Sequence, residues 1–134
     1  MTALQFFADR NLGDHVVPEA LRLRGWQVVT LRERYGSADA QRLADVDWIR
    51  DAAEAGEVLL TADKAVAKRP LEAQAVIGAS ARVFALGTSK LTGPQQAERY
   101  LENESAIFKR ARRSGGPWVI SVTGHGLVPI KLFG

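Results

Sequence analysis

The sequence predicts a three-layer α/β fold around a mainly parallel β-sheet, with a hairpin at its C-terminal end. Short apolar segments alternate with segments of helical length along almost the whole chain. The apolar segments are continuous, which is typical of parallel strands that are buried on both faces. A chain of 134 residues has the usual length of one domain, and we expect a single domain over residues 1–134.

The first half of the chain contains three predicted strands, at 4–8, 26–31 and 57–62. A helix that is capped by Asn11 or Asp14 and stopped by Gly25 connects the first two. The polar, glycine-containing segment 32–40 is predicted to be a loop. Another helix follows this loop and stops at Gly56, just before the third strand.

Two further helices and three further strands are predicted in the second half of the chain. The helices cover about 70–77 and 92–113, and the strands cover 82–86, 118–122 and 127–132. Pro70 suits the first turn of its helix, and the segment 114–117 breaks the long helix. A turn at 124–126 lets the last two strands pair as an antiparallel hairpin.

Composition limits the class of protein. The net charge of +3 and the sequence pI of about 9.6 are compatible with a polyanionic partner, or equally with an ordinary basic surface. The absence of cysteine excludes disulfides, thiolate metal sites and cysteine nucleophiles. Asp9 and Arg10 interrupt the apolar stretch that a secretory signal would need, and no stretch approaches the roughly 20 apolar residues of a membrane span. We therefore expect a cytoplasmic protein without a membrane partner.

Acidic residues lie at the ends of two predicted strands. Asp9 directly follows the first strand and Asp63 the third, while Asp45 and Asp47 open the helix between them. In a parallel sheet these strand ends share one edge, where α/β proteins bind ligands. Crowded carboxylates suit Mg²⁺ or Mn²⁺, which can drive phosphodiester hydrolysis. Because Asp is also a common helix cap, Asp63 or one of the Asp45–Asp47 pair could instead be structural.

Four segments resemble the PIN-like domains of VapC-type toxins. They are 6–13 (FFADRNLG), 23–30 (LRGWQVVT), 45–49 (DVDWI) and 58–64 (VLLTADK). The stretch 60–64 is the most specific part of this resemblance. The family implies a small Rossmann-like α/β ribonuclease that uses Mg²⁺ or Mn²⁺, that an antitoxin protein masks, and that often forms a homodimer.

The resemblance also implies roles for individual residues. Asp9, Asp45 and Asp63 would be metal ligands, and Asp47 would be a fourth acidic catalytic candidate. The family often carries an acidic residue after the fourth strand, but here the stretch 87–90 is Gly-Thr-Ser-Lys. This departure leaves a second metal ion open. Within that stretch, Thr88 or Ser89 could hold a metal-bound water and Lys90 could contact phosphate, or all three could belong to an ordinary polar loop.

Basic residues accompany the acidic ones. Lys64, Lys68 and Arg69 directly follow Asp63, and Arg10 follows Asp9. We expect these four cations to bind the RNA backbone beside the metal site, although the connector at 64–69 could also be an ordinary solvated segment.

Two other classes of function compete with a metal-dependent ribonuclease. One is a catalytically degenerate PIN-like module that only binds a partner. The other is a phosphoacceptor signalling domain, which also places aspartates after its first and third strands. That domain would need a second acidic residue after the first strand and a lysine after the fifth, whereas Arg10 and Thr123 stand there.

Overall fold

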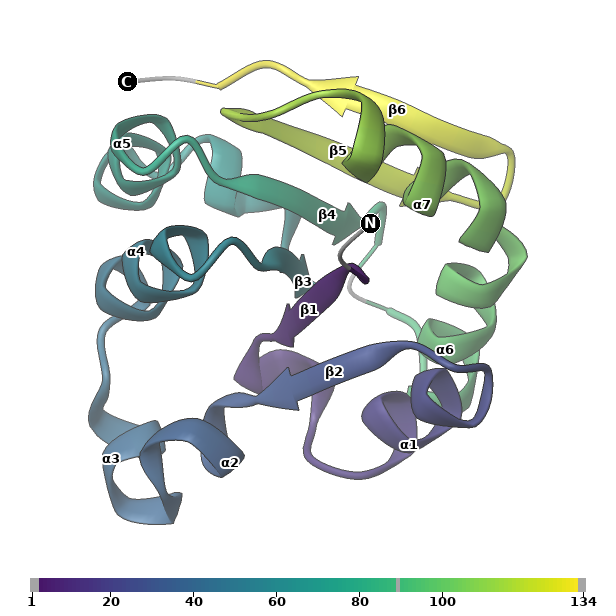
Figure 1. Cartoon of the computed structure of the whole chain (residues 1–134), viewed down its shortest axis with the longest axis horizontal. Coiled ribbons are helices and arrows are strands. Elements are labelled where there is room, and N and C mark those ends of the chain that lie inside the picture. The colour runs from purple at the N-terminus through teal and green to yellow at the C-terminus, as the bar shows by residue number, and fades with distance from the viewer. Residues whose placement is uncertain (1–2, 89, 133–134) are drawn as a thin grey trace.

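One six-stranded sheet forms the centre of the protein (Figure 1). The computed structural model describes residues 3–88 and 90–132, and the strand order within them is β2-β1-β3-β4-β5-β6. The strands are β1 (Gln5–Ala8), β2 (Gln27–Thr30), β3 (Val58–Thr61), β4 (Arg82–Leu86), β5 (Trp118–Thr123) and β6 (Gly126–Ile130). Neighbouring strands from β2 to β5 are parallel, and β6 is antiparallel to β5. The predicted mainly parallel sheet and its C-terminal hairpin are therefore confirmed.

Helices cover both faces of this sheet (Figure 1). The α-helices are α1 (Val16–Leu23), α2 (Leu31–Tyr35), α3 (Ser37–Arg42), α4 (Asp45–Glu54), α5 (Pro70–Gly78), α6 (Gly93–Glu102) and α7 (Glu104–Arg113). Two short 3-10 helices, η1 (Arg10–Leu12) and η2 (Lys64–Ala67), follow β1 and β3. Among the residues that the structure describes, no helix is both long and apolar enough to cross a membrane.

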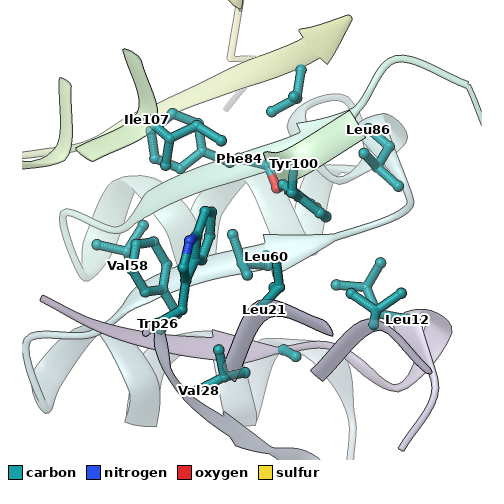
Figure 2. Close-up of a cluster of buried hydrophobic side chains, with 14 of the residues drawn as sticks. Leu12, Leu21, Trp26, Val28, Val58, Leu60, Phe84, Leu86, Tyr100 and Ile107 are labelled. Atoms are coloured by element: carbon teal, nitrogen blue, oxygen red, sulfur yellow. Dashed lines mark hydrogen bonds between the residues drawn. The ribbon is translucent and has the colours of Figure 1, made fainter. Parts of the chain in front are cut away.

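Alternating side chains along the strands divide the core into two clusters. Leu60 and Phe84 face α1, α6 and α7, where they pack with Trp26 and Tyr100 (Figure 2). Phe6 belongs to the same cluster. The intervening strand residues pack on the other side against α4 and α5; they include Phe7, Leu59 and Val83. Strand side chains alternate between faces, so apolar residues at consecutive positions are buried only when both faces are covered. The continuous apolar strands thus explain the three layers.

The segment after β2 corrects one sequence-based expectation. Residues 32–40 were predicted to be a loop, but they form most of α2 and α3. The Thr30 hydroxyl accepts a hydrogen bond from the Glu33 amide, and the Glu33 carboxylate accepts one from the Thr30 amide. This capping box satisfies two amides that a helix start otherwise leaves unpaired. Its Thr-x-x-Glu signature is present in the sequence.

An ion pair holds α2 against the sheet. The Arg34 guanidinium donates to both carboxylate oxygens of Glu57, at 2.6 and 2.5 Å. The Glu57 side chain is only 6% exposed, and Arg34 also lies 4.8 Å from the centre of the Phe7 ring. Such a two-pronged contact is both strong and geometrically specific. It fixes α2 beside the amino end of β3.

The predicted long helix at 92–113 is also corrected, because it is divided into α6 and α7 at Asn103. The Asn103 amide group donates to the backbone oxygens of Arg99, in α6, and of Thr123, at the end of β5. These bonds tie the helix break to the sheet. An asparagine that bonds nearby backbone in this way competes with continued helix.

Candidate functional site

Two aspartates meet at the carboxyl edge of the sheet. Strands β1 and β3 are parallel neighbours, with Ala8 opposite Leu60, and the Asp9 amide donates to the Leu60 carbonyl oxygen at 2.9 Å. Asp9 and Asp63 line one cleft of about 180 Å³, together with Asp45 from the first turn of α4. The expectation that the carboxylates after β1 and β3 share one edge is therefore confirmed.

Asp9 is the most buried of these acids, since only 6% of the residue is exposed. Its Oδ1 accepts a hydrogen bond from the Arg10 amide at 2.6 Å, and its Oδ2 accepts one from the Thr61 hydroxyl at 2.9 Å. Burial raises the pKa of Asp9 from 3.8 to about 6; the Thr61 bond opposes this rise, and the nearby charge of Asp45 adds to it. A carboxyl group whose pKa is raised by burial and by a neighbouring negative charge is typical of functional sites.

Thr61 connects the two strand ends. Its hydroxyl donates to Asp9 and accepts from the Asp63 amide and from the Asn11 side chain, each at 3.1 Å. The Asn11 side chain also accepts from the Ala62 amide at 3.0 Å. Thr61 was not proposed as a site residue from the sequence. Its position two residues before Asp63, inside the most specific stretch of the resemblance, was the available signal.

Asp45 and Asp47 have different surroundings although they share one turn of α4. Asp45 accepts a hydrogen bond from the Trp48 indole at 3.0 Å and lies 4.0 Å from the Arg10 guanidinium. Asp47 pairs with Arg50 at 2.9 Å and is not among the described residues that line the cleft. Residues two apart on a helix do not face each other, which explains the difference. Neither is the N-cap, because Ala44 occupies that position.

Asp63 is both a helix cap and a cleft residue, so the two interpretations of it are compatible. Its Oδ1 accepts a hydrogen bond from the Ala65 amide at 2.9 Å and caps η2. Its Oδ2 lies 2.6 Å from the guanidinium of Arg69, which precedes α5. The hydrogen bond to Asp63 raises the pKa of Arg69, so this cation keeps its charge. The second guanidinium nitrogen reaches Glu72 at 3.4 Å.

The other predicted cations lie at different distances from the cleft. Arg10 and Arg69 line it, whereas Lys64 and Lys68 are exposed on the η2 segment directly after Asp63. After β4, neither Thr88 nor Lys90 belongs to the described lining, and their mutual contact is a turn bond from the Lys90 amide to the Thr88 hydroxyl. Ser89, the other residue proposed there, lies outside the described residues.

The donor set of the cleft suits a hard divalent cation. Asp9, Asp45 and Asp63 supply only carboxylate oxygens, which Mg²⁺ and Mn²⁺ prefer. Within residues 3–88 and 90–132, however, no three acidic or histidine side chains are arranged closely enough to hold an ion as they stand. Asp45 instead lies beside the Arg10 guanidinium, and Asp63 pairs with Arg69. The chemistry of these donors therefore fits a divalent metal ion, although their present arrangement does not form a ligand set.

A mainly parallel sheet with an acidic cleft at its carboxyl edge is the arrangement expected of a PIN-like α/β domain. A family model described as "PIN like domain" matches residues 4–88, which contain the whole cleft, and the chain belongs to this family. The chain is also 35% identical over 124 residues to "Putative ribonuclease VapC45" of Mycobacterium tuberculosis (strain ATCC 25618 / H37Rv). That similarity covers 92% of this chain and 89% of the relative, which confirms the VapC-type resemblance. No solved structure gave a significant match.

Proposed function

We propose that this protein is an endoribonuclease that hydrolyses RNA phosphodiester bonds with Mg²⁺ or Mn²⁺, and that it is the toxin of a toxin–antitoxin pair. The observation that carries the proposal is the meeting of Asp9, Asp45 and Asp63, from three separate elements, in one cleft. The name of the relative supports a ribonuclease. We take residues 1–134 to act as a single PIN-like domain.

In this proposal Asp9, Asp45 and Asp63 hold the metal ion. A carboxylate-bound divalent cation polarises phosphoryl oxygens and makes water a better nucleophile. Asp47 remains a fourth acidic candidate, although its pairing with Arg50 makes it a weaker one than Asp45.

Neighbouring residues position these carboxylates. Thr61 and Asn11 hold Asp9 and the backbone of residues 61–63 in place through four hydrogen bonds. The Thr61 hydroxyl donates to Asp9, and the Asn11 side-chain amide donates to Thr61. The Ala62 backbone amide donates to the Asn11 side chain, and the Asp63 backbone amide donates to the Thr61 hydroxyl. The Trp48 indole does the same for Asp45. Partners of this kind orient metal ligands before the ion arrives, which lowers the cost of binding.

Cations around the cleft suit an RNA backbone. We assign Arg10, Lys64, Lys68 and Arg69 to phosphate contacts, because two of them line the cleft and the two lysines lie exposed beside it. Phosphate contacts hold a substrate in register without recognising its sequence. Each contact that is lost should also weaken the salt dependence of RNA binding.

The remaining parts of the proposal follow from membership of the VapC-type group. We propose an antitoxin protein that covers the cleft, action in the cytoplasm, and a homodimer in solution. Mass spectrometry of proteins that co-purify with this chain from its own cells tests the partner, and light scattering of the purified chain tests the oligomeric state.

The test of the enzymatic function is RNA cleavage by highly purified protein. Cleavage should require Mn²⁺ or Mg²⁺ and should stop on chelation. Asp9→Asn and Asp63→Asn should each lower the rate by at least about 100-fold, the upper end of losses from outer-shell changes at metal sites. Asp39→Asn is the matched control, because Asp39 is exposed and pairs with Arg42 away from the cleft. Equal cleavage by Asp63→Asn would indicate a contaminant. Inactivity on a broad RNA panel without metal binding would favour a binding-only module.

A further inference from the structure

A second pocket adjoins the acidic cleft. It has a volume of about 280 Å³ and lies where β1 and β2 end, between η1 and the helices α2 and α3. Arg10 lines both this pocket and the cleft, so the two cavities meet at this side chain. The Arg10 guanidinium donates to the Leu43 carbonyl oxygen at 2.5 Å, which fixes it between them.

The walls of this pocket offer unused hydrogen-bonding groups. Ser37 and Gln41, on α3, are exposed, and neither side chain makes a hydrogen bond within the described part of the chain. Arg32 is 55% exposed and lies 3.7 Å from Asp14 on the opposite wall. The buried side chain of Leu31 supplies an apolar surface at the base. Within the described residues, the Gln41 amide and the Ser37 hydroxyl are therefore available to bond a ligand, and the half-exposed Arg32 guanidinium keeps one face open beside its pair with Asp14.

We propose that this pocket binds one unpaired RNA nucleotide next to the scissile phosphate and recognises its base. The inference rests on the proposed ribonuclease function and adds its specificity. Gln41 and Ser37 bond the edge of the base, Arg32 stacks on its face, and Arg10 contacts the phosphate between pocket and cleft.

The size and chemistry of the pocket favour a single nucleotide. Its volume of about 280 Å³ is just below the roughly 300–1,000 Å³ of pockets for drug-sized ligands. Sequence-specific RNA recognition mostly uses unpaired bases, which bond through their edges and stack on aromatic rings or arginine planes. An amide side chain offers a donor and an acceptor together, which matches the paired groups on a base edge. The position beside the acidic cleft means that a base held here has its own backbone at the proposed metal site.

Base preference is the quantity that tests this inference. Wild-type protein with Mn²⁺ is given a pool of RNA with random sequence, and the cleaved ends are sequenced. Binding is measured separately, with Asp63→Asn protein and fluorescein-labelled homohexamers of the four RNA bases. Gln41→Ala and Ser37→Ala are then compared with Gln74→Ala, a matched glutamine that lines a different groove, between α4 and α5. Thermal unfolding of each variant establishes that it is folded.

We expect wild-type protein to prefer one base at a single position beside the cut. Gln41→Ala should reduce that preference by about tenfold, the size of effect that one lost base contact produces, while Gln74→Ala should leave it unchanged. The homohexamer affinities should show the same pattern without cleavage. If the base preference is unchanged in both Gln41→Ala and Ser37→Ala, the inference is overturned, while the ribonuclease function stands. A segment of a partner protein would then be the occupant of the pocket. Absence of both cleavage and RNA binding in wild-type protein overturns the function and the inference together.

Discussion

The guanidinium of Arg69 lies 2.6 Å from Oδ2 of Asp63, so a cation of the chain itself neutralises one of the proposed metal ligands. An ion bound to this oxygen would compete with Arg69 for the same negative charge. A guanidinium displaced in this way can turn towards Glu72, which it already reaches at 3.4 Å, or towards a phosphate of the RNA. Metal and substrate binding would thus both act on one arginine.

Replacing Arg69 should separate these two effects. Arg69→Gln should bind Mn²⁺ about two- to fivefold more tightly, because an exposed ion pair is worth roughly 0–1 kcal/mol. The same variant should bind RNA more weakly, with a salt dependence reduced by about one phosphate contact. Calorimetric titration with Mn²⁺, without RNA, measures the first effect. Arg42→Gln, which removes an arginine paired with Asp39 on α3, is the control. Weaker Mn²⁺ binding in Arg69→Gln would show that Arg69 orients Asp63 instead of competing for it.

The unusual environment of Asp9 should appear in the pH dependence of stability. The pKa of Asp9 is about 6 in the folded protein and 3.8 in the reference state. Between pH 3.8 and pH 6, Asp9 is therefore protonated to a greater extent in the folded protein than in the unfolded chain. The resulting stabilisation is fully present below about pH 4 and is lost as the pH rises through 6; a shift of this size corresponds to about 3 kcal/mol. The stability of Asp9→Asn minus that of wild type should therefore be larger at pH 7 than at pH 4, by roughly 2.5 kcal/mol. Urea unfolding across this range measures the difference, and a difference independent of pH would contradict the assigned pKa.

Much of this site follows from the sequence, because Asp9 and Asp63 each come directly after a continuous apolar stretch, and Asp45 opens a helix between them. Such stretches have few alternatives to a buried parallel sheet. Their carboxyl ends then lie at one edge of that sheet. The sequence-based prediction was wrong where short-range signals competed. Gly36 and the polar residues around it suggested a loop, while the capping box at Thr30 formed a helix. The break at Asn103 depends on the Thr123 carbonyl, 20 residues away, which no local pattern contains.

Thr61 should be a positioning residue whose hydroxyl matters more than its bulk. Thr61→Val keeps the shape but removes the bonds to Asp9 and the Asp63 amide, while Thr61→Ser keeps them. Loss of such outer partners typically costs about 10–100-fold in metal affinity or activity. We expect that loss in Thr61→Val and near-normal Mn²⁺ affinity in Thr61→Ser, both measured by calorimetry. Equal affinity in the two variants would mean that Thr61 contributes only packing.

The Arg34–Glu57 pair should be important for stability and unimportant for the chemistry. Removing one partner of a buried ion pair leaves the other charge uncompensated, and this usually costs about 3–5 kcal/mol. Glu57→Ala should lose less than this, about 1.5–3 kcal/mol in urea unfolding, because the Arg34 side chain that is left unpaired is 27% exposed and can be hydrated. Asp39→Ala, which breaks an exposed pair, should change stability by no more than about 0.5 kcal/mol. Below its melting temperature, Glu57→Ala should cleave RNA at the wild-type rate, because Glu57 precedes β3 and lies at the opposite end of that strand from Asp63.

The two aspartates at the start of α4 provide the most direct test of the site as the structure arranges it. The sequence alone makes Asp45 and Asp47 similar candidates, but only Asp45 lines the cleft among the described residues, while Asp47 pairs with Arg50. Asp45→Asn removes a proposed ligand and keeps the shape, so cleavage should fall by at least about 100-fold and Mn²⁺ should bind more weakly. Asp47→Asn loses only an exposed i,i+3 pair, worth roughly 0.2–0.5 kcal/mol, and should stay within about threefold of wild type. Both cleavage rates are measured with saturating Mn²⁺ and again with limiting Mn²⁺. Excess metal partly restores the rate of a variant that has lost a metal ligand, but it does not restore the rate of a variant that has lost a general base. The reverse ranking, with Asp47→Asn inactive and Asp45→Asn active, would place the metal on the other side of α4.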